Sequence, residues 1–530
     1  MGTGLDVDSC YRAVSGRDAR FDGVFFTAVR TTGIYCRPSC PATTPKRANV
    51  TFFRTAAAAQ LGGYRACRRC RPDVSPGSPE WNVRADLVAR VMRLVADGEV
   101  ERVGVAGLAH EVGYSQRHLN RLVTEELGAG VLAIARAQRA HTARLLLETT
   151  ELPVAEVGWA AGFGSVRSLN DTVRVAYQAT PGQLRRAAWG ARGRPPADSS
   201  EFGQLSPVRP ACRPNSEEFA GGGAVGSITV RLAARAPFDA AATLAFLGVR
   251  AIAGIESWDG TVYRRTLDLP HGHGTVAIVD HDATGVVAKL RLTDLRDIAP
   301  AVARVRRMLD LDADPQAVEA VLGADPHLAE WIRARPGLRA PTCAEPLEAL
   351  VRAICGQQVS LAGGRAVAER LVAQHGETLS FADDRLTLVF PRAATLAAVD
   401  PESLPVPRAR GRCLVQAAAL VADGQVSLGP GADREELALR LLEVPGIGPW
   451  TLGYLAMRGL GDPDVLLSGD LVVRRALART GLPEAPAALA ERARTWRPWR
   501  SYVTVHAWAA TAAATSDELH HRPARSARTA

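Results

Sequence analysis

The stretch "TTGIYCRPSC" at residues 31–40 carries two cysteines, Cys36 and Cys40, and "RACRRC" at residues 65–70 carries two more, Cys67 and Cys70. Two close pairs separated by a loop are the usual layout of a tetrahedral four-cysteine zinc site. On spacing alone, the commonest such site is closed and purely structural. The basic residues that crowd these cysteines favour a position against a phosphate backbone; they are Arg37, Arg65, Arg68, Arg69 and Arg71.

A zinc-bound cysteine also has chemistry of its own. Its sulfur stays deprotonated at neutral pH, although a free cysteine has a pKa of about 8.5. Such a thiolate is a nucleophile towards an alkyl group. Four thiolates around one divalent cation carry net negative charge, which DNA phosphates repel. Methylating one sulfur reduces that charge, so an alkylated protein is expected to bind DNA more tightly.

Composition favours a DNA-binding protein of several domains. At about 150 residues per domain, a chain of 530 residues suggests three or four domains. The formal net charge of +9 favours an anionic partner such as nucleic acid. We expect no membrane span and no signal peptide, because the sequence has neither a long apolar run nor a basic start followed by one. A cytoplasmic location follows as an expectation, and disulfides are rare there.

The chain divides by pattern into six parts. The first, 1–78, holds the cysteine pairs, and 82–190 is predicted to be helical. Residues 191–226 are rich in Pro, Gly and Ser, which is typical of a flexible linker. Alternating and β-branched stretches over 227–300 predict a small sheet. Helical patterns return over 301–513, and 514–530 is expected to be a disordered tail.

An internal repeat in the helical part points to DNA. "LAHEVGYSQRHLNRLV" (108–123) matches "VGWAAGFGSVRSLNDTV" (157–173): each has a small-residue helix, a glycine turn, an aromatic residue and a serine placed to cap the next helix. This is the helix-turn-helix plan, although an ordinary pair of helical hairpins is the alternative. The second helices present polar residues that can reach bases and phosphates; these are Gln116, Arg117, Asn120, Arg121, Arg167, Asn170 and Arg174. Together the two units resemble the AraC-type DNA-binding domain.

A second DNA-binding pattern lies in "LLEVPGIGPWTLGYLAMRGLGDPDVLLSGDLVVRRAL" (441–477). Gly446 and Gly448 allow a tight turn between two helices, and the free N–H groups of the next helix, including that of Thr451, can face a phosphate. This predicts a helix-hairpin-helix, with a simple helix–helix turn as the alternative. Asp470 follows at the predicted start of another helix, where an aspartate is usually only a cap.

The first part of the chain resembles the N-terminal domain of the Ada family of adaptive-response proteins. The resemblance rests on "AVRTTGIYCRPSCPA", "NVTFF" and "YRACRRCRPD" and covers about residues 5–75. It implies that Cys36 accepts a methyl group from a DNA methylphosphotriester and that Cys36, Cys40, Cys67 and Cys70 hold Zn2+. The basic residues that the family places just after the second cysteine are replaced here by Pro41 and Thr43. No Pro-Cys-His-Arg motif is present, so no O6-methylguanine acceptor is expected.

Residues 228–512 resemble the helix-hairpin-helix DNA glycosylases of the AlkA type, through the hairpin stretch, "LEALVRAICGQQVSLAGG" and "RPWRSYVTVHAWAA". The resemblance implies that Asp470 is the catalytic carboxylate and that Gln358 stands where the family inserts a wedge into the duplex. It also implies that three aromatic residues stack on the flipped base, where cation–π attraction favours an alkylated base; they are Trp450, Tyr454 and Trp508. No lysine lies in the hairpin, so excision without strand cleavage is expected.

These observations predict a multidomain, mainly α protein. A small zinc-bound α/β domain and an all-α double helix-turn-helix domain precede an α+β glycosylase. The predicted function is a response to DNA alkylation, with double-stranded DNA at damaged and promoter sites as partner, RNA polymerase as a further partner, no membrane contact and a monomeric state. The alternative is a transcriptional regulator with a structural zinc site and a non-catalytic glycosylase-like domain.

Overall fold

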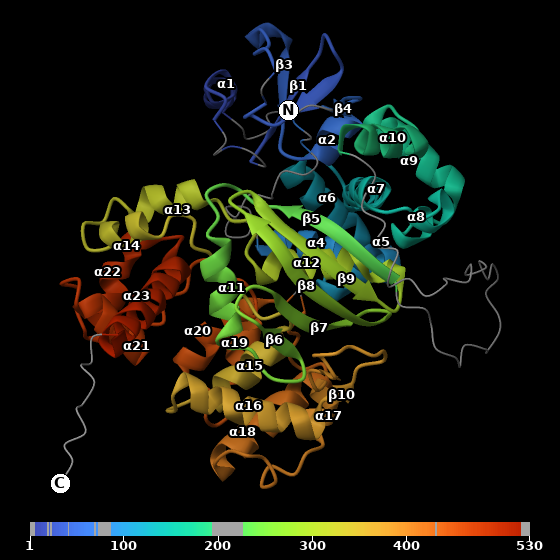
Figure 1. Cartoon of the computed structure of the whole chain (residues 1–530). Helices are drawn as coiled ribbons and strands as arrows, with labels where there is room; N and C mark the ends of the chain where they lie inside the picture. The colour runs from blue at the N-terminus through green and yellow to red at the C-terminus, as the bar shows by residue number, and fades with distance from the viewer. Residues whose placement is uncertain are drawn as a thin grey trace, which may run out of the picture.

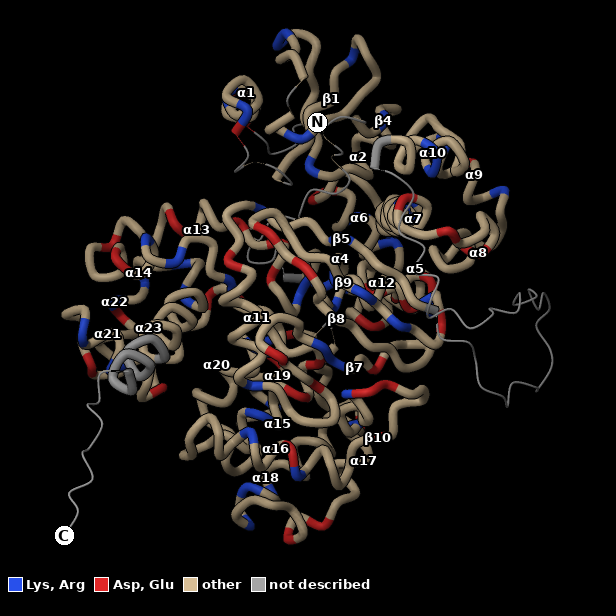
Figure 2. Tube along the Cα trace, viewed as in Figure 1, with Lys and Arg blue, Asp and Glu red and all other residues tan. Residues whose placement is uncertain are grey.

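The computed structural model describes residues 6–18, 21, 24–40, 42–67, 70, 72, 86–192, 226–429 and 432–520. The N-terminal domain lies at one end of the molecule with a helical domain beside it, a five-stranded sheet lies in the middle, and most of the C-terminal helices lie at the opposite end and along one side (Figure 1). Lysine and arginine positions are spread over all three parts and interleave with acidic ones (Figure 2). No helix among these residues is long and apolar enough to cross a membrane.

The N-terminal domain is a small sheet with one helix at each end. Its strands lie in the order β3-β1-β2-β4, with β2 and β4 parallel and the other pairs antiparallel. Phe25, Phe52 and Cys10 pack in a small buried core between the sheet and α1. The elements are α1 (Val7–Ser15), β1 (Phe26–Val29), β2 (Ile34–Cys36), η2 (Arg47–Asn49), β3 (Val50–Phe53), α2 (Ala56–Leu61) and β4 (Arg65–Ala66).

The second domain is entirely helical, as the repeat predicts. Gly113 and Gly162 both adopt φ of +78°, the left-handed conformation that a turn between two helices requires. Ser115 accepts a hydrogen bond from the His118 N–H, and Ser165 accepts one from the Ser168 N–H, so both predicted caps are confirmed. The helices are α4 (Asp86–Ala96), α5 (Glu99–Glu111), α6 (Gln116–Leu127), α7 (Val131–Thr149), α8 (Val154–Ala160), α9 (Val166–Tyr177) and α10 (Pro181–Arg192).

The predicted small sheet is a five-stranded antiparallel one in the order β5-β9-β8-β7-β6. The alternation of apolar residues along its strands places Val230, Val276 and Leu290 in the core. Most of the predicted linker, 193–225, lies outside the described residues. The elements are β5 (Gly226–Ala233), α11 (Ala240–Gly248), β6 (Glu256–Trp258), β7 (Tyr263–Leu269), β8 (Gly272–Asp282), β9 (Gly285–Leu292) and η4 (Leu295–Asp297).

The C-terminal body is helical apart from one short two-stranded pairing. Its last helix extends to His520, so it continues past residue 513, where a disordered tail was expected to begin; 521–530 lie outside the described residues. The elements are α12 (Ile298–Met308), α13 (Pro315–Leu322), α14 (Ala329–Ala334), α15 (Pro346–Cys355), α16 (Leu361–His375), β10 (Glu377–Thr378), β11 (Leu388–Val389), α17 (Ala393–Ala397), α18 (Arg408–Ala422), α19 (Arg434–Leu442), α20 (Pro449–Arg458), α21 (Leu471–Ala478), α22 (Pro486–Arg492), η5 (Ala493–Trp496) and α23 (Arg500–His520).

The helix-turn-helix domain packs directly against the C-terminal half. Arg307 on α12 forms an ion pair with Asp97 at 3.2 Å, and Arg90 on α4 pairs with Asp433 at 3.2 Å. One apolar cluster is continuous from the N-terminal sheet through α7 and α9 to the five-stranded sheet. The structure therefore joins the two halves through contacts as well as through the linker.

Candidate functional sites

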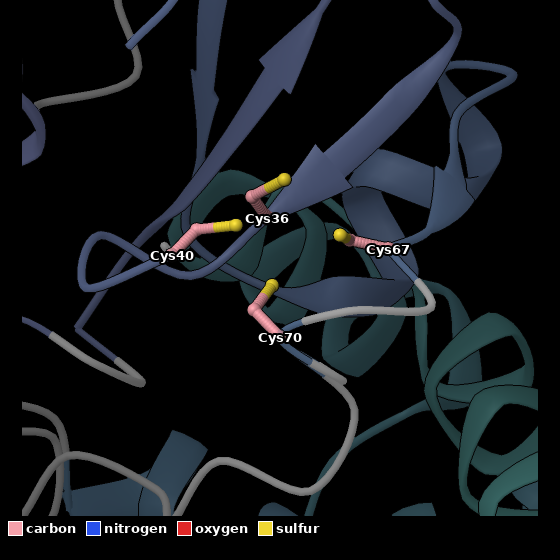
Figure 3. A group of neighbouring side chains, drawn as sticks. All are labelled: Cys36, Cys40, Cys67 and Cys70. Carbon is pink, nitrogen blue, oxygen red and sulfur yellow. The ribbon is translucent and has the colours of Figure 1, made fainter. Parts of the chain in front are cut away.

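The four predicted zinc ligands meet at one end of the N-terminal sheet. The parallel register of β2 and β4 pairs Tyr35 with Ala66, so the cysteines that follow these residues leave adjacent strands together. The sulfur atoms of Cys36, Cys40, Cys67 and Cys70 all lie within 4.8 Å of one another and point toward a common centre (Figure 3). A tetrahedral zinc with bonds of about 2.3 Å would need sulfur atoms about 3.8 Å apart. The cluster therefore fits Zn2+ in both donor chemistry and size.

The four cysteines differ in burial. Cys67 and Cys70 are buried, whereas Cys36 at the end of β2 and Cys40 after it are partly exposed. Hydrogen bonding with Cys40, more than with the other two thiols, raises the pKa of Cys36, while hydrogen bonding with Cys36 lowers the pKa of Cys67. The thiols thus share protons, and a bound cation would release them. An accessible sulfur in a metal-ligand cluster is positioned to meet an alkyl donor from outside.

The basic residues around the cluster are only partly described. Arg65 on β4 is partly exposed next to the cysteines, but Arg68, Arg69 and Arg71 lie outside the described residues, as does Pro41. Arg47 forms an ion pair with Asp8 and lies 5.8 Å from the Tyr11 ring. Arg47 is therefore held against α1.

The helix-turn-helix residues expected to meet DNA fall into two groups. Arg117 and Arg121 on α6 and Arg167 and Arg174 on α9 are exposed, and Arg121 and Arg167 pair with acidic residues one turn later. Asn170 is only partly exposed and donates its amide to the Val166 carbonyl.

Asn120 on α6 also has a structural role. Its Oδ1 accepts a hydrogen bond from the Val131 N–H at 3.2 Å, and therefore it caps α7. The side-chain oxygen of Asn120 therefore holds two helices together, while the residue as a whole is exposed on α6.

The helix-hairpin-helix forms at the predicted place, between α19 and α20. Gly446 adopts φ of +99°, which favours glycine, and Gly448 precedes the first residue of α20. Thr451 is 2% exposed, and its N–H lies in the first turn of α20. Its hydroxyl accepts a hydrogen bond at 3.1 Å from Gln357, whose amide also donates to the Gly446 carbonyl at 2.9 Å.

Gln357 was missed by the sequence reasoning, and it ties the hairpin to the turn that carries the wedge position. Gln358, at that position between α15 and α16, is exposed and has φ of +56°. The neighbouring apolar side chains of Val359 and Leu361 are 43% and 53% exposed. Because Gln357 fixes the turn to the hairpin, the two loops form one surface.

Asp470 and the three predicted pocket aromatics lie in a row. Asp470 caps α21 by accepting a hydrogen bond from the Val473 N–H at 3.0 Å, and its other carboxylate oxygen accepts one from Trp450 Nε1 at 3.1 Å. Ring centroids are separated by 5.4 Å between Trp450 and Tyr454 and by 6.4 Å between Tyr454 and Trp508. All four side chains are partly exposed. The rings of Trp450, Tyr454 and Trp508 form an accessible aromatic wall, and the Asp470 carboxylate stands at its edge.

The wall has a further member that comes from the sheet subdomain. Phe246 on α11 stacks against Trp508, with ring centroids 6.0 Å apart and planes inclined by 24°. Arg250 lies with its guanidinium carbon 3.6 Å from the Phe246 centroid. The sequence alone does not point to Phe246 or Arg250, because nothing in the local pattern "LAFLGVRAIAGIE" distinguishes Phe246 from ordinary core.

Comparison with known proteins identifies the domains and the family. Models of the metal binding domain of Ada, a helix-turn-helix domain and the AlkA N-terminal domain match residues 9–73, 108–187 and 229–345. The probable bifunctional transcriptional activator/DNA repair enzyme AlkA of Mycobacterium tuberculosis is 47% identical over 506 residues, which is 95% of this chain and 96% of that protein. The chain belongs to this family of bifunctional activator and repair enzymes.

Two relatives match one half of the chain each. DNA-3-methyladenine glycosylase 2 of Escherichia coli is 33% identical over 276 residues, 51% of this chain and 94% of that protein. The bifunctional transcriptional activator/DNA repair enzyme Ada of Escherichia coli is 37% identical over 142 residues, 27% of this chain and 39% of that protein. Members of this AlkA family thus carry an Ada-type metal centre, which here is the four-cysteine zinc site, and a glycosylase-type half on one DNA-binding chain.

Proposed function

We propose that this protein answers DNA methylation with two separate reactions. Cys36 irreversibly accepts a methyl group from a DNA methylphosphotriester, and the methylated protein activates transcription. The C-terminal half hydrolyses the N-glycosidic bond of alkylated bases such as 3-methyladenine. One observation carries the proposal: the same chain holds a sulfur cluster with an accessible Cys36 and an aromatic wall with Asp470 at its edge.

The methyl transfer is a direct displacement. The Cys36 sulfur attacks the methyl carbon, the carbon–oxygen bond of the triester breaks, and the phosphodiester leaves as an anion. Bound Zn2+ would keep the attacking sulfur deprotonated, with Cys40, Cys67 and Cys70 as the other ligands. A thioether is neutral, so the cluster loses negative charge on methylation and approaches phosphates with less repulsion. The reaction happens once per protein molecule.

The glycosylase reaction turns over. A flipped base would stack on Trp450, Tyr454 and Trp508, and the Asp470 carboxylate would stabilise the positive charge that develops on the sugar as the base departs. Because the Asp470 oxygens already accept hydrogen bonds from Val473 and Trp450, the carboxylate is held in one orientation. Water then adds to the sugar carbon.

The reaction is proposed to stop at base removal. The sequence has two lysines, Lys46 in the N-terminal domain and Lys289 on β9, and neither lies in the hairpin. Trp450 stands where lyase-active relatives carry a lysine, so no Schiff base with the sugar can form there.

Further assignments are proposals of the same kind. Exposed Arg117, Arg121, Arg167 and Arg174 support promoter binding through α6 and α9. Activation implies contact with RNA polymerase. The protein is proposed to act as a monomer in the cytoplasm, where cysteines persist as metal ligands rather than as disulfides.

Both reactions can be tested in one experiment. The full-length protein is incubated with DNA that carries methylphosphotriesters and 3-methyladenine, followed by peptide mass spectrometry and chromatography of released bases. A methyl adduct on Cys36 together with free 3-methyladenine is expected. Cys36→Ser should lose the adduct while keeping base release.

The alternative function gives the opposite outcomes. A transcriptional regulator with a structural zinc site would bind metal and form no adduct on Cys36. A non-catalytic glycosylase-like half would bind DNA and release no base. Either negative result overturns the corresponding half of the proposal.

A further inference from the structure

Two arginines stand behind the aromatic wall, at the end remote from Asp470. The guanidinium carbon of Arg250 lies 3.6 Å from the Phe246 ring centroid and 5.7 Å from that of Trp508. The guanidinium carbon of Arg458, on α20, lies 4.8 Å from the Phe246 centroid. The end of the wall formed by Trp508 and Phe246 therefore carries two positive charges.

Neither charge is neutralised by a carboxylate in the described parts of the chain. Arg458 is 2% exposed, and its Nε and Nη1 have no hydrogen-bond partner there. Arg250 donates one hydrogen bond, to the Phe246 carbonyl at 3.0 Å. Burial, with a smaller effect from the charge of Arg458, lowers the pKa of Arg250 to about 9, so Arg250 stays protonated at neutral pH.

Their neighbour Arg352 is a buried arginine whose charge is neutralised by carboxylates. It forms ion pairs with Glu256 and Glu348, and donates to the Arg250 carbonyl at 2.7 Å. Arg250 and Arg458 have no such carboxylates among the described residues, and Arg250 keeps some exposure. Their positive charge is therefore free to act on a group bound along the wall.

The wall is thus charged in opposite senses at its two ends. Contacts run from Asp470 to Trp450, from Trp450 to Tyr454, and from Tyr454 to Trp508, which in turn adjoins Arg250. A nucleotide bound along it would have its sugar near the carboxylate and its base nearer the guanidinium groups.

We propose that Arg250 and Arg458 drive departure of the base by favouring negative charge on it. This inference rests on the glycosylase activity proposed above. As the bond between the sugar carbon C1′ and the base nitrogen breaks, its electron pair moves to the base and positive charge develops on the sugar. The arginines stabilise the first change and Asp470 the second, and water then bonds to C1′ and releases a proton. An interaction that strengthens along the reaction in this way accelerates the chemical step.

The charge of the damaged base decides how this effect divides between binding and rate. A neutral base such as hypoxanthine departs as an anion, so the arginines leave its binding unchanged and speed its departure. A cationic base such as 7-methylguanine departs as a neutral molecule. The arginines repel it when bound and release that repulsion as it leaves, so they weaken binding and raise the rate together.

The test measures single-turnover excision of hypoxanthine and of 7-methylguanine from otherwise identical duplexes by full-length wild type and Arg250→Met. The maximal rate constant should fall about tenfold for both bases, because each departure adds the same negative charge to the base. The enzyme concentration at half-maximal rate should fall for 7-methylguanine and stay constant for hypoxanthine. Arg458→Met should behave in the same way, and Arg250→Lys should restore the wild-type pattern.

Arg339 provides the matched control. It is a fully buried arginine whose guanidinium carbon lies 5.2 Å from the Phe238 ring, so Arg339→Met removes a similar contact elsewhere in the glycosylase half. Arg339→Met should lower the melting temperature, and any change in the excision parameters should be the same for hypoxanthine and 7-methylguanine.

Two different failures are distinguishable. The role of the arginines would be overturned if the half-maximal enzyme concentration changed equally for the two bases. It would also be overturned if neither maximal rate constant changed. Absence of base release by the wild-type protein would instead overturn the proposed glycosylase activity.

Discussion

The zinc cluster and the base pocket contrast in how they are assembled. The four cysteines come from 35 consecutive residues, at and just after the ends of two neighbouring strands of one small sheet. The pocket draws on α11, α20, α21 and α23, from the sheet subdomain and from distant parts of the helical body. A site of the first kind can be recognised from spacing alone, whereas the second exists only once its subdomains have docked.

The two sites also differ in what holds them together. The core that belongs to the N-terminal domain alone is small, although its sheet also joins the apolar cluster shared with the other domains, so metal coordination contributes directly to the fold there. The pocket residues adjoin extensive apolar clusters that do not depend on a metal. Removing a ligand should therefore damage the zinc domain far more than removing a functional residue damages the glycosylase half.

The largest expected effect comes from Cys67→Ala. Structural zinc contributes about 10 kcal/mol or more to the fold of a small domain, so we expect the N-terminal domain to unfold while excision continues. Metal analysis measures bound zinc, circular dichroism measures folding of the domain, and base release measures excision. Cys10→Ala, a buried non-ligand in the same domain, is the control and should keep its zinc. Retention of zinc by Cys67→Ala would show that Cys67 is not a ligand.

Asp470→Asn should abolish most of the excision activity without affecting the zinc domain. Removing an electrostatic stabiliser of a transition state costs about 100-fold or more in rate. Methyl transfer to Cys36 should proceed normally. The control is Asp433→Asn, because Asp433 also caps a helix, α19, but lies outside the pocket. Excision near the wild-type rate would remove Asp470 from the mechanism.

A smaller effect is expected from Trp450→Phe. This change keeps an aromatic ring but deletes the donor to Asp470 Oδ2, and a hydrogen bond to a charged group contributes about 1.5 kcal/mol or more, or at least about tenfold in rate. Rates measured on saturating substrate separate this loss from weaker stacking. Trp331→Phe on α14 should leave the rate unchanged. If Trp450→Phe were equally harmless, the hydrogen bond would have no role in orienting the carboxylate.

The smallest effect concerns the contact between the two halves. Arg307→Ala removes the ion pair with Asp97 and should cost about 1 kcal/mol or less, since both side chains retain some exposure. Thermal unfolding of the full-length protein should show the helix-turn-helix domain melting slightly earlier than the glycosylase half. Removing the exposed pair of Arg408 and Glu402 should not separate the transitions. Unchanged unfolding in Arg307→Ala would mean that the apolar cluster and the Arg90–Asp433 pair couple the halves without it.

Local sequence patterns predicted several helix caps and the position of the sheet correctly. The helix-turn-helix caps Ser115 and Ser165, the cap at Asp470 and the five-stranded sheet are where local patterns predict them. These features depend on residues within a few positions of one another. The extension of α23 past residue 513 was not expected, because its polar residues resemble those of a tail.

The sequence by itself determined the chemistry that the chain brings: four sulfurs at zinc spacing, a carboxylate at a helix start and aromatic residues near it. Cysteine spacing and helix capping depend on residues close together in the chain, so both can be recognised without knowledge of the fold. It took the folded structure to show that the Thr451 hydroxyl binds Gln357, that Asn120 caps α7, and that Phe246 and Arg250 contact Trp508. Those roles depend on contacts between distant segments, whose positions are fixed by packing and not by the residues adjacent in the chain.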